Sequence, residues 1–236
     1  SDTSAPYEGS FTPSGTGAVT VEARARATDG GTSTQQVSVN AQSPTLAIAA
    51  SALLGTPANA GQPSANVQQF ITLSGIYFKD QTDIIFPTIS QDGTTGTETI
   101  RVENVSPDRS KVTVRVPYNA QTGALQLAGT SASATLQVVP SINSFNNGSF
   151  NPSGLSRNLT LNGGGLIEGG IDVLFGDVTV SDPDTGVETI DVYYGNNTGL
   201  STIIPDAAKG NVRVRSAGGT SNELIYLLAW ESLAER

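Results

Sequence analysis

The segment from Phe70 to Phe86 has the sequence FITLSGIYFKDQTDIIF, and a related segment returns at Asn158 to Phe175 as NLTLNGGGLIEGGIDVLF. Each copy has a run of alternating apolar residues, then a break that contains glycine, then a second apolar run. Alternation with a period of two is typical of a β-strand with one buried face, and glycine marks a turn or a bulge. The two segments therefore predict a pair of strands that occurs twice in the chain.

The similarity extends well beyond these segments. Leu73 and Leu161 are 88 positions apart, as are Pro117 and Pro205, and the Glu-Thr-Ile triplets at 98–100 and 188–190 are 90 apart. A nearly constant offset indicates two tandem domains. A unit of about 90 residues with several short strands and regular turn signals is typical of a β-sandwich, so we predict an all-β fold with two such domains.

Four parts of the chain follow from this repeat: an incomplete β segment at 1–43, a first sandwich at 44–139, a second at 140–229 and a tail at 230–236. The first part contains the phrase GSFTPSG at 9–15, which returns as GSFNPSG at 148–154, so this part begins like a domain. Its Asp29-Gly30-Gly31 turn predicts a hairpin. Because an isolated hairpin is marginally stable in water, this part is expected to pack on something.

The net charge and the composition of the chain limit the classes of partner that it can bind. The chain has 21 acidic and 12 basic residues and a net charge of −9, so it lacks the basic surface that nucleic acids require. No apolar run approaches the roughly 18 residues of a membrane span. Charged residues make up only 14% of the chain, and this polar, weakly charged composition favours an extracellular, cell-surface or virion protein.

Three residue types are missing altogether: histidine, cysteine and methionine. Without histidine and cysteine, nucleophilic triads, imidazole acid–base chemistry and thiolate metal sites are excluded. A carboxylate pair of the glycosidase kind stays open, although no pair stands out from the acidic residues expected in turns. We therefore predict that the protein is not an enzyme. A chain that starts at Ser1 without methionine is expected to be a processed product or a piece of something longer.

Several motifs resemble one known family. A strand that ends in Phe175-Gly176, an apolar–proline step at Ile204-Pro205, and a Gly-x-Val-x-Val strand from Gly210 are similar to IPT/TIG domains of the immunoglobulin-like superfamily. The resemblance covers roughly 44–228 and is clearer in the second domain, since the first has Pro87 where the family pattern has glycine. It implies an immunoglobulin-like sandwich that serves as a spacer or binding module, and it implies no catalytic residues.

One acidic loop is a candidate metal site. Carboxylates followed by a glycine could wrap a hard cation with oxygen ligands, as calcium prefers. The alternative is a solvated turn whose geometry is set by Pro183 and Gly186. No other cofactor is expected. The candidate calcium ligands are Asp177, Asp182, Asp184 and Glu188.

Aromatic side chains offer a second candidate site, a platform for a surface glycan. Packing in the core or at hairpin edges is the more common use of such rings. Tyr193 and Tyr194 are neighbours on one expected strand, so they must face opposite sides of it. The candidate platform residues are Tyr7, Tyr77, Tyr118, Tyr193, Tyr194 and Trp230.

These observations favour a non-catalytic structural or adhesive building block of an assembly outside the cytoplasm, such as a cell-surface layer, a filament or an adhesin stalk. Residues 1–43 would pair their free strand edges with another copy or with a neighbouring structural subunit. Two alternatives stay open: a decoration or fibre protein of a bacteriophage virion, and a carbohydrate-binding module.

Overall fold

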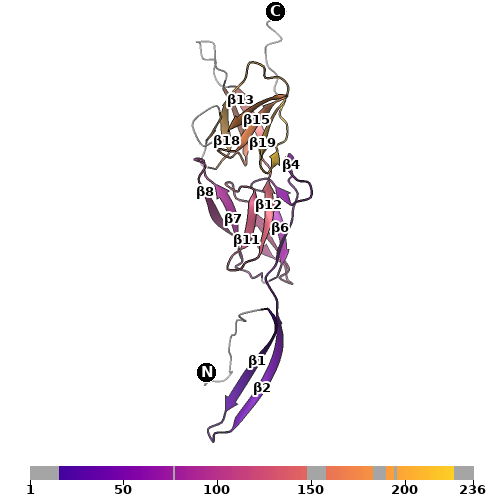
Figure 1. The fold of residues 1–236 in the computed structure, drawn as a ribbon, viewed down its shortest axis with the longest axis vertical. Coiled ribbons are helices and arrows are strands. Elements are labelled where there is room, and N and C mark those ends of the chain that lie inside the picture. Colours follow the sequence, from indigo (N-terminus) through magenta and orange to yellow (C-terminus); the bar gives the residue numbers. More distant parts are fainter. Residues whose placement is uncertain (1–15, 77, 148–157, 183–189, 194–195, 226–236) are drawn as a thin grey trace, which may run out of the picture. The chain divides into compact units, whose positions relative to one another are not determined.

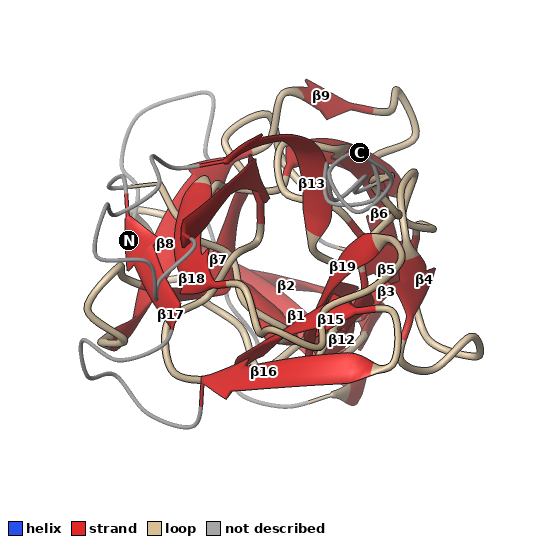
Figure 2. Cartoon of the chain, turned by 90° about the horizontal axis from the view of Figure 1, so that it is seen from above, coloured by secondary structure: helices blue, strands red, loops and turns tan. Residues whose placement is uncertain are grey.

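The computed structural model describes residues 16–76, 78–147, 158–182, 190–193 and 196–225. Every regular element in these ranges is a β-strand, so the prediction of an all-β fold is confirmed (Figures 1 and 2). The chain divides into two compact units, Ser1–Pro44 and Thr45–Arg236. In the described ranges, no helix has the length and apolar character needed to cross a membrane.

The described part of the first unit is one antiparallel hairpin, which we call the ribbon. Its strands are β1 (Gly17–Arg26) and β2 (Thr32–Ala41), and they pair without interruption along their whole length. The amide of Ala27 donates to the carbonyl oxygen of Gly31 at 2.8 Å and closes the turn. Gly30 has a φ of +90° there, a conformation that glycine adopts without the penalty paid by other residues.

The second unit begins with a β-sandwich. One sheet has the strand order β3-β6-β10-β9 and the other has the order β5-β12-β11-β7-β8. The strands are β3 (Leu46–Ala49), β5 (Ser64–Ala65), β6 (Phe70–Gly75), β7 (Asp83–Ile89), β8 (Thr95–Arg101), β9 (Asn104–Val105), β10 (Lys111–Arg115), β11 (Gly123–Leu127) and β12 (Ser133–Val138).

Period-two burial accounts for the core of this first sandwich. Leu73 on β6 and Phe86 on β7 are both 0% exposed, whereas Phe70 is 52% exposed. The buried side chains of both sheets form one cluster. Each fully buried Leu, Ile or Phe contributes about 1.5–3 kcal/mol relative to exposure, so this alternation is the main favourable term.

A second sandwich with its own core cluster follows. Its sheets have the orders β13-β14-β18-β17 and β16-β15-β19-β20-β4, where β4 comes from the first sandwich. The strands are β4 (Thr56–Pro57), β13 (Ser141–Asn147), β14 (Asn158–Gly164), β15 (Ile171–Phe175), β16 (Val178–Asp182), β17 (Ile190–Tyr193), β18 (Gly199–Ile203), β19 (Val212–Ser216) and β20 (Gly219–Thr220).

The repeated glycines have a packing role. A Cβ at Gly75 would collide with the carbonyl oxygen of Thr45, and a Cβ at Gly163 would collide with that of Ser141. The glycine thus lets β6 lie directly against β3 in the first sandwich, and β14 directly against β13 in the second. This close approach of backbones explains why the break after the alternating run recurs as glycine.

One detail differs from the sequence expectations. The isoleucines of the two Glu-Thr-Ile triplets are not equivalent: Ile100 pairs with Ile84 on β7, whereas Ile190 pairs with Thr202 on β18. That pair of triplets therefore resembles a repeat only in sequence.

Candidate functional site: the ribbon and the joint between the sandwiches

Two of the four expected calcium ligands, Asp177 and Asp182, lie far apart. Asp177 lies in the turn between β15 and β16, and Asp182 lies at the far end of β16, opposite Ile171. A strand of this length spans about 16 Å, so one ion cannot contact both side chains. In the described ranges, no group of three or more potential ligands forms a metal site. Asp184 and Glu188 lie outside the described residues, so their part in the expected calcium site stays a prediction.

Asp182 has a visible structural role instead. It is 4% exposed, and its Oδ2 accepts a hydrogen bond from the amide of Gly169 at 2.9 Å. The neighbouring Glu168 is 5% exposed, and its Oε2 accepts from the amide of Val192 at 2.8 Å. The sequence analysis missed Glu168 because nothing in its pattern indicates burial. These two carboxylates hold backbone segments of the second sandwich together.

Only two residues of the expected aromatic platform, Tyr118 and Tyr193, lie among the described residues. Tyr118 is 43% exposed and Tyr193 is half-buried on β17. The other four members, Tyr7, Tyr77, Tyr194 and Trp230, lie outside the described residues. Phe70, which the sequence analysis placed in a strand without a surface role, is exposed and lies 5.5 Å from the Arg115 guanidinium. The described residues therefore present two exposed rings, Phe70 and Tyr118.

The ribbon has one apolar and one polar face. Directly opposed residues of an antiparallel pair lie on the same face, and the opposed pairs include Val19 with Val39 and Val21 with Val37. We call this side the valine face. Val37 is 55% exposed and Val39 is 44% exposed, so the face is largely uncovered.

On the other face, one hydrogen bond links the two strands and a second lies within β1. Glu22 Oε2 accepts from Gln36 Nε2 at 2.9 Å, and Glu22 Oε1 accepts from Arg24 at 2.8 Å. These two hydrogen bonds, that from Gln36 first, lower the pKa of Glu22 below its usual value. The polar face therefore adds a side-chain link between the strands, whereas the valine face is largely exposed.

The outer edge of β2 has no charged residue. Its sequence is TSTQQVSVNA, with neither a proline nor a charge. Among the described residues, the only strand that pairs with β2 is β1. Edge strands are usually protected by charges, proline or shortness. The edge strand β8 of the first sandwich carries Glu98 and Arg101, and β9 has only two residues. The β2 edge is thus an unprotected pairing surface.

The ribbon corresponds to the last hairpin of a sandwich. Gly17-Ala18-Val19-Thr20-Val21 resembles Gly123-Ala124-Leu125-Gln126-Leu127 at β11, and β2, like β12, ends shortly before a proline and the next first strand. The shared phrase GSFTPSG had instead suggested the opening strands. However, β6 and β14 are each followed by a strand in the opposite sheet, whereas β1 pairs with its successor. The pairing therefore favours the closing hairpin.

The two sandwiches meet in a joint built largely from backbone contacts. β4 of the first sandwich pairs with β20 of the second, with Pro57 opposite Gly219. The side chain of Asn197, which is 1% exposed, donates to the carbonyl oxygen of Ile89 at 2.8 Å. A Cβ at Gly218 would collide with the carbonyl oxygen of Val138. We call this set of contacts the joint.

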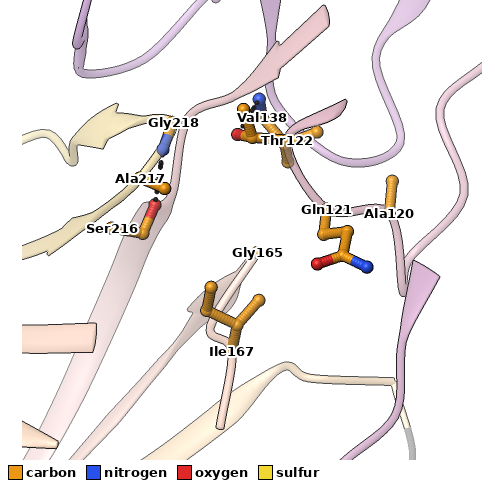
Figure 3. Close-up of a pocket in the computed structure, with 9 residues that line it drawn as sticks. All are labelled: Ala120, Gln121, Thr122, Val138, Gly165, Ile167, Ser216, Ala217 and Gly218. Atoms are coloured by element: carbon orange, nitrogen blue, oxygen red, sulfur yellow. Dashed lines mark hydrogen bonds between the residues drawn. The ribbon is translucent and has the colours of Figure 1, made fainter. Parts of the chain in front are cut away.

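A small pocket lies at the joint. Gln121 and Thr122 of the first sandwich line it together with Ile167 and Gly218 of the second (Figure 3). The amide of Gly218 donates to Ser216 Oγ at 3.3 Å beside it. The cavity volume is about 50 Å³, which is room for a few water molecules. The pocket is therefore a feature of the joint rather than a ligand site.

No family model matches the chain, and no curated protein matches it. Among solved structures, SGBP-B from a complex xyloglucan utilization locus in Bacteroides uniformis is 16% identical, with a TM-score of 0.28. The match covers 78% of this chain and 49% of that one.

Two adhesin structures are similar at the same level. A tetra-tandem repeat from the extending region of a large adhesion protein is 15% identical over 89% of this chain and 55% of that one, with a TM-score of 0.26. A Ca²⁺-stabilized, ice-binding adhesin of an Antarctic bacterium is 14% identical over 88% and 56%, with a TM-score of 0.19. The chain spans about half the length of these solved structures. TM-scores this low carry no functional argument.

Proposed function

We propose that this protein is a non-catalytic structural and adhesive building block of an assembly outside the cytoplasm, and that its subunits associate by β-strand pairing of the ribbon. The observation that carries the proposal is the pairing surface itself. The ribbon is a two-stranded sheet with an exposed valine face and an uncharged outer edge. Two strands alone are marginally stable in water, whereas three or more with an apolar face can be stable.

The ribbon offers two different contacts, an edge and a face. Edge pairing enlarges its sheet, and packing on the valine face covers the enlarged sheet. A subunit with two independent contacts can build more than a dimer, because each contact can engage a different neighbour. This property supports a layer, filament or stalk as the form of the assembly.

The tandem sandwiches suit the role of a spacer. Their joint combines strand pairing between β4 and β20 with the buried hydrogen bond from Asn197 to Ile89. Such contacts restrict bending between two domains more than a linker alone does. We assign both sandwiches to the IPT/TIG type of immunoglobulin-like domain as part of this proposal, on the basis of the motifs in the sequence.

The absence of histidine and cysteine from the sequence supports the non-catalytic part of the proposal. The low share of charged residues, 14%, supports a place outside the cytoplasm.

Deletion of residues 1–41 tests the proposal. We expect the full chain to show concentration-dependent association by light scattering and ordered particles by negative-stain electron microscopy. The deletion variant should be a monomer whose circular dichroism shows intact sandwiches, because their cores lie entirely within the second unit. Association that persists after the deletion would place the assembly surface on the sandwiches and refute the proposal.

A further inference from the structure

We infer that the partner of the ribbon is a second copy of this chain, which pairs antiparallel along the outer edge of β2 with Val37 opposite Val39 of the second copy. The inference rests on the proposed function and names the edge, the partner and the register. Four observations support it. They are the direction of the free backbone groups of β2, the strands that pair with the equivalent edges in the sandwiches, the net charge of the ribbon, and the positions of the valines.

The free hydrogen-bonding groups of β2 belong to its even-numbered residues. In an antiparallel ladder, opposed pairs alternate between hydrogen-bonded and non-bonded. The closing bond from Ala27 to Gly31 makes the odd-numbered pairs, such as Val21 with Val37, the bonded ones. The amide and carbonyl groups of Gln36 and Ser38 therefore point away from β1. The outer edge is a regular row of donors and acceptors.

The equivalent edge accepts an added strand in both sandwiches. On β12 that edge pairs with β5 in the parallel direction, with Val138 beside Ala65. On β20 it pairs with β4, which comes from the neighbouring sandwich. The ribbon is a closing hairpin of the same kind, and among the described residues its β2 edge has no such strand. An added strand at this position is thus the recurring arrangement in this chain.

Charge favours a second copy as the source of that strand. Residues 16–44 contain Glu22 and Asp29 against Arg24 and Arg26, so two negative and two positive charges give a net charge of zero, while the whole chain carries −9. Two copies would repel each other through their other surfaces but not through the ribbons. Both acidic residues lie on β1 or in the turn, away from the outer edge of β2.

The register follows from the valines. If Val37 pairs with Val39 of the second copy, the reciprocal pair forms by two-fold symmetry, as an isologous contact requires. Each row across the four-stranded sheet then contains four valines, since Val21 is opposite Val37 and Val19 is opposite Val39 within each ribbon. Directly opposed β-branched residues stabilise a sheet. In this register Ser38 lies on the two-fold axis, opposite Ser38 of the second copy.

Cysteine cross-linking tests the register cleanly because the chain has no cysteine. Hydrogen-bonded residues across an antiparallel pair have Cα atoms about 5.5 Å apart, which a disulfide can bridge. We expect Ser38→Cys in the full chain to form a disulfide-linked dimer under mild oxidation at least tenfold faster than Thr34→Cys. Thr34 is the matched control: it has the same strand, face and exposure, but its two copies would lie about 27 Å apart along the strands.

A second pair of variants does not depend on oxidation. Ser38→Lys places two positive charges opposite each other on the axis and should abolish dimers, whereas Thr34→Lys adds the same charge away from the axis and should retain them. Fast cross-linking through Gln36→Cys or Val37→Cys instead would overturn the register. Cross-linking through Thr20→Cys would overturn the choice of β2, because Thr20 lies on β1.

The outcomes separate this inference from the proposed function. If deletion of residues 1–41 abolishes association but Ser38→Cys gives no dimer and Ser38→Lys has no effect, the ribbon is the assembly surface and a copy-to-copy β2 contact is refuted. An open sandwich of another subunit would then be the partner. If the deletion leaves association unchanged, the proposed function itself fails.

Discussion

Replacement of Asn197 by glycine should destabilise the second unit by breaking the side-chain contact across the joint. Asn197 is 1% exposed, and its Nδ2 donates to the carbonyl oxygen of Ile89 at 2.8 Å. Loss of a buried hydrogen bond whose remaining partner stays buried costs about 1–3 kcal/mol. For a unit of this size, about 2 kcal/mol lowers Tm by roughly 4–8 °C.

Backbone conformation supplies an internal check on this prediction. Asn197 has a φ of +54°, in the left-handed region that glycine and asparagine tolerate. Asn197→Gly therefore removes the hydrogen bond without adding strain, whereas Asn197→Ala adds about 1 kcal/mol of left-handed strain. Stability should fall in the order wild type, glycine variant, alanine variant.

Urea denaturation followed by circular dichroism measures the effect, with Asn162→Ala as the control. Asn162 makes a 3.3 Å hydrogen bond to Ser144 within one sandwich and does not reach the joint. Its replacement should change stability by no more than about 0.5 kcal/mol. If Asn197→Gly is as stable as wild type, the hydrogen bond contributes nothing and the argument for a stabilised joint fails.

Three further predictions concern the repeat and the acidic side chains. Gly163→Ala should lower the free energy of unfolding by about 1–3 kcal/mol, measured by thermal melts, because its Cβ would meet the backbone of Ser141. Gly170→Ala should be nearly neutral, because its Cβ would meet only Ile167 Cδ1 at 3.8 Å. Glu22 should titrate by NMR below the usual pKa of a glutamate side chain, so its link to Gln36 is intact above that usual pKa and is lost as the pH falls through the lowered pKa. Gln36→Ala should return the midpoint toward the usual value. Hydrogen bonds from Ser106 and Ser110 lower the pKa of Asp108 to about 2, so the turn before β10 should persist to about pH 2. Ser106→Ala should raise the titration midpoint of Asp108, and an unchanged midpoint would refute the assigned cause.

The sequence was sufficient to predict the sandwiches because their burial alternates with period two. Leu73 and Leu161 have equivalent places in the two cores, and both are 0% exposed. The hairpin at Asp29-Gly30-Gly31 was predictable for a related reason, since its turn chemistry is local. These features depend only on neighbours in the sequence or on a repeated pattern.

The joint was not predictable from local patterns. β4 has two residues, Thr56 and Pro57, in a loop rich in glycine and proline, and it becomes a strand only because β20 of the other sandwich pairs with it. The separation of Asp177 and Asp182 was not predictable either, because they are close in sequence but lie at opposite ends of a strand. Contacts between domains and the direction of a strand both require the three-dimensional structure.

The chemistry of the β2 edge makes the proposed assembly different from one held by surface charge. A β2 pair would be held by backbone hydrogen bonds and valine contacts, and β2 contributes no charged side chain. Screening by salt weakens exposed ion pairs but leaves such contacts almost unchanged, while the repulsion between subunits of net charge −9 is reduced. Association measured by light scattering should therefore stay constant or strengthen from low salt to about 1 M, and sulfate should strengthen it further because it favours apolar burial. A steep loss of association with salt would show that ion pairs, and not the β2 edge, hold the subunits together.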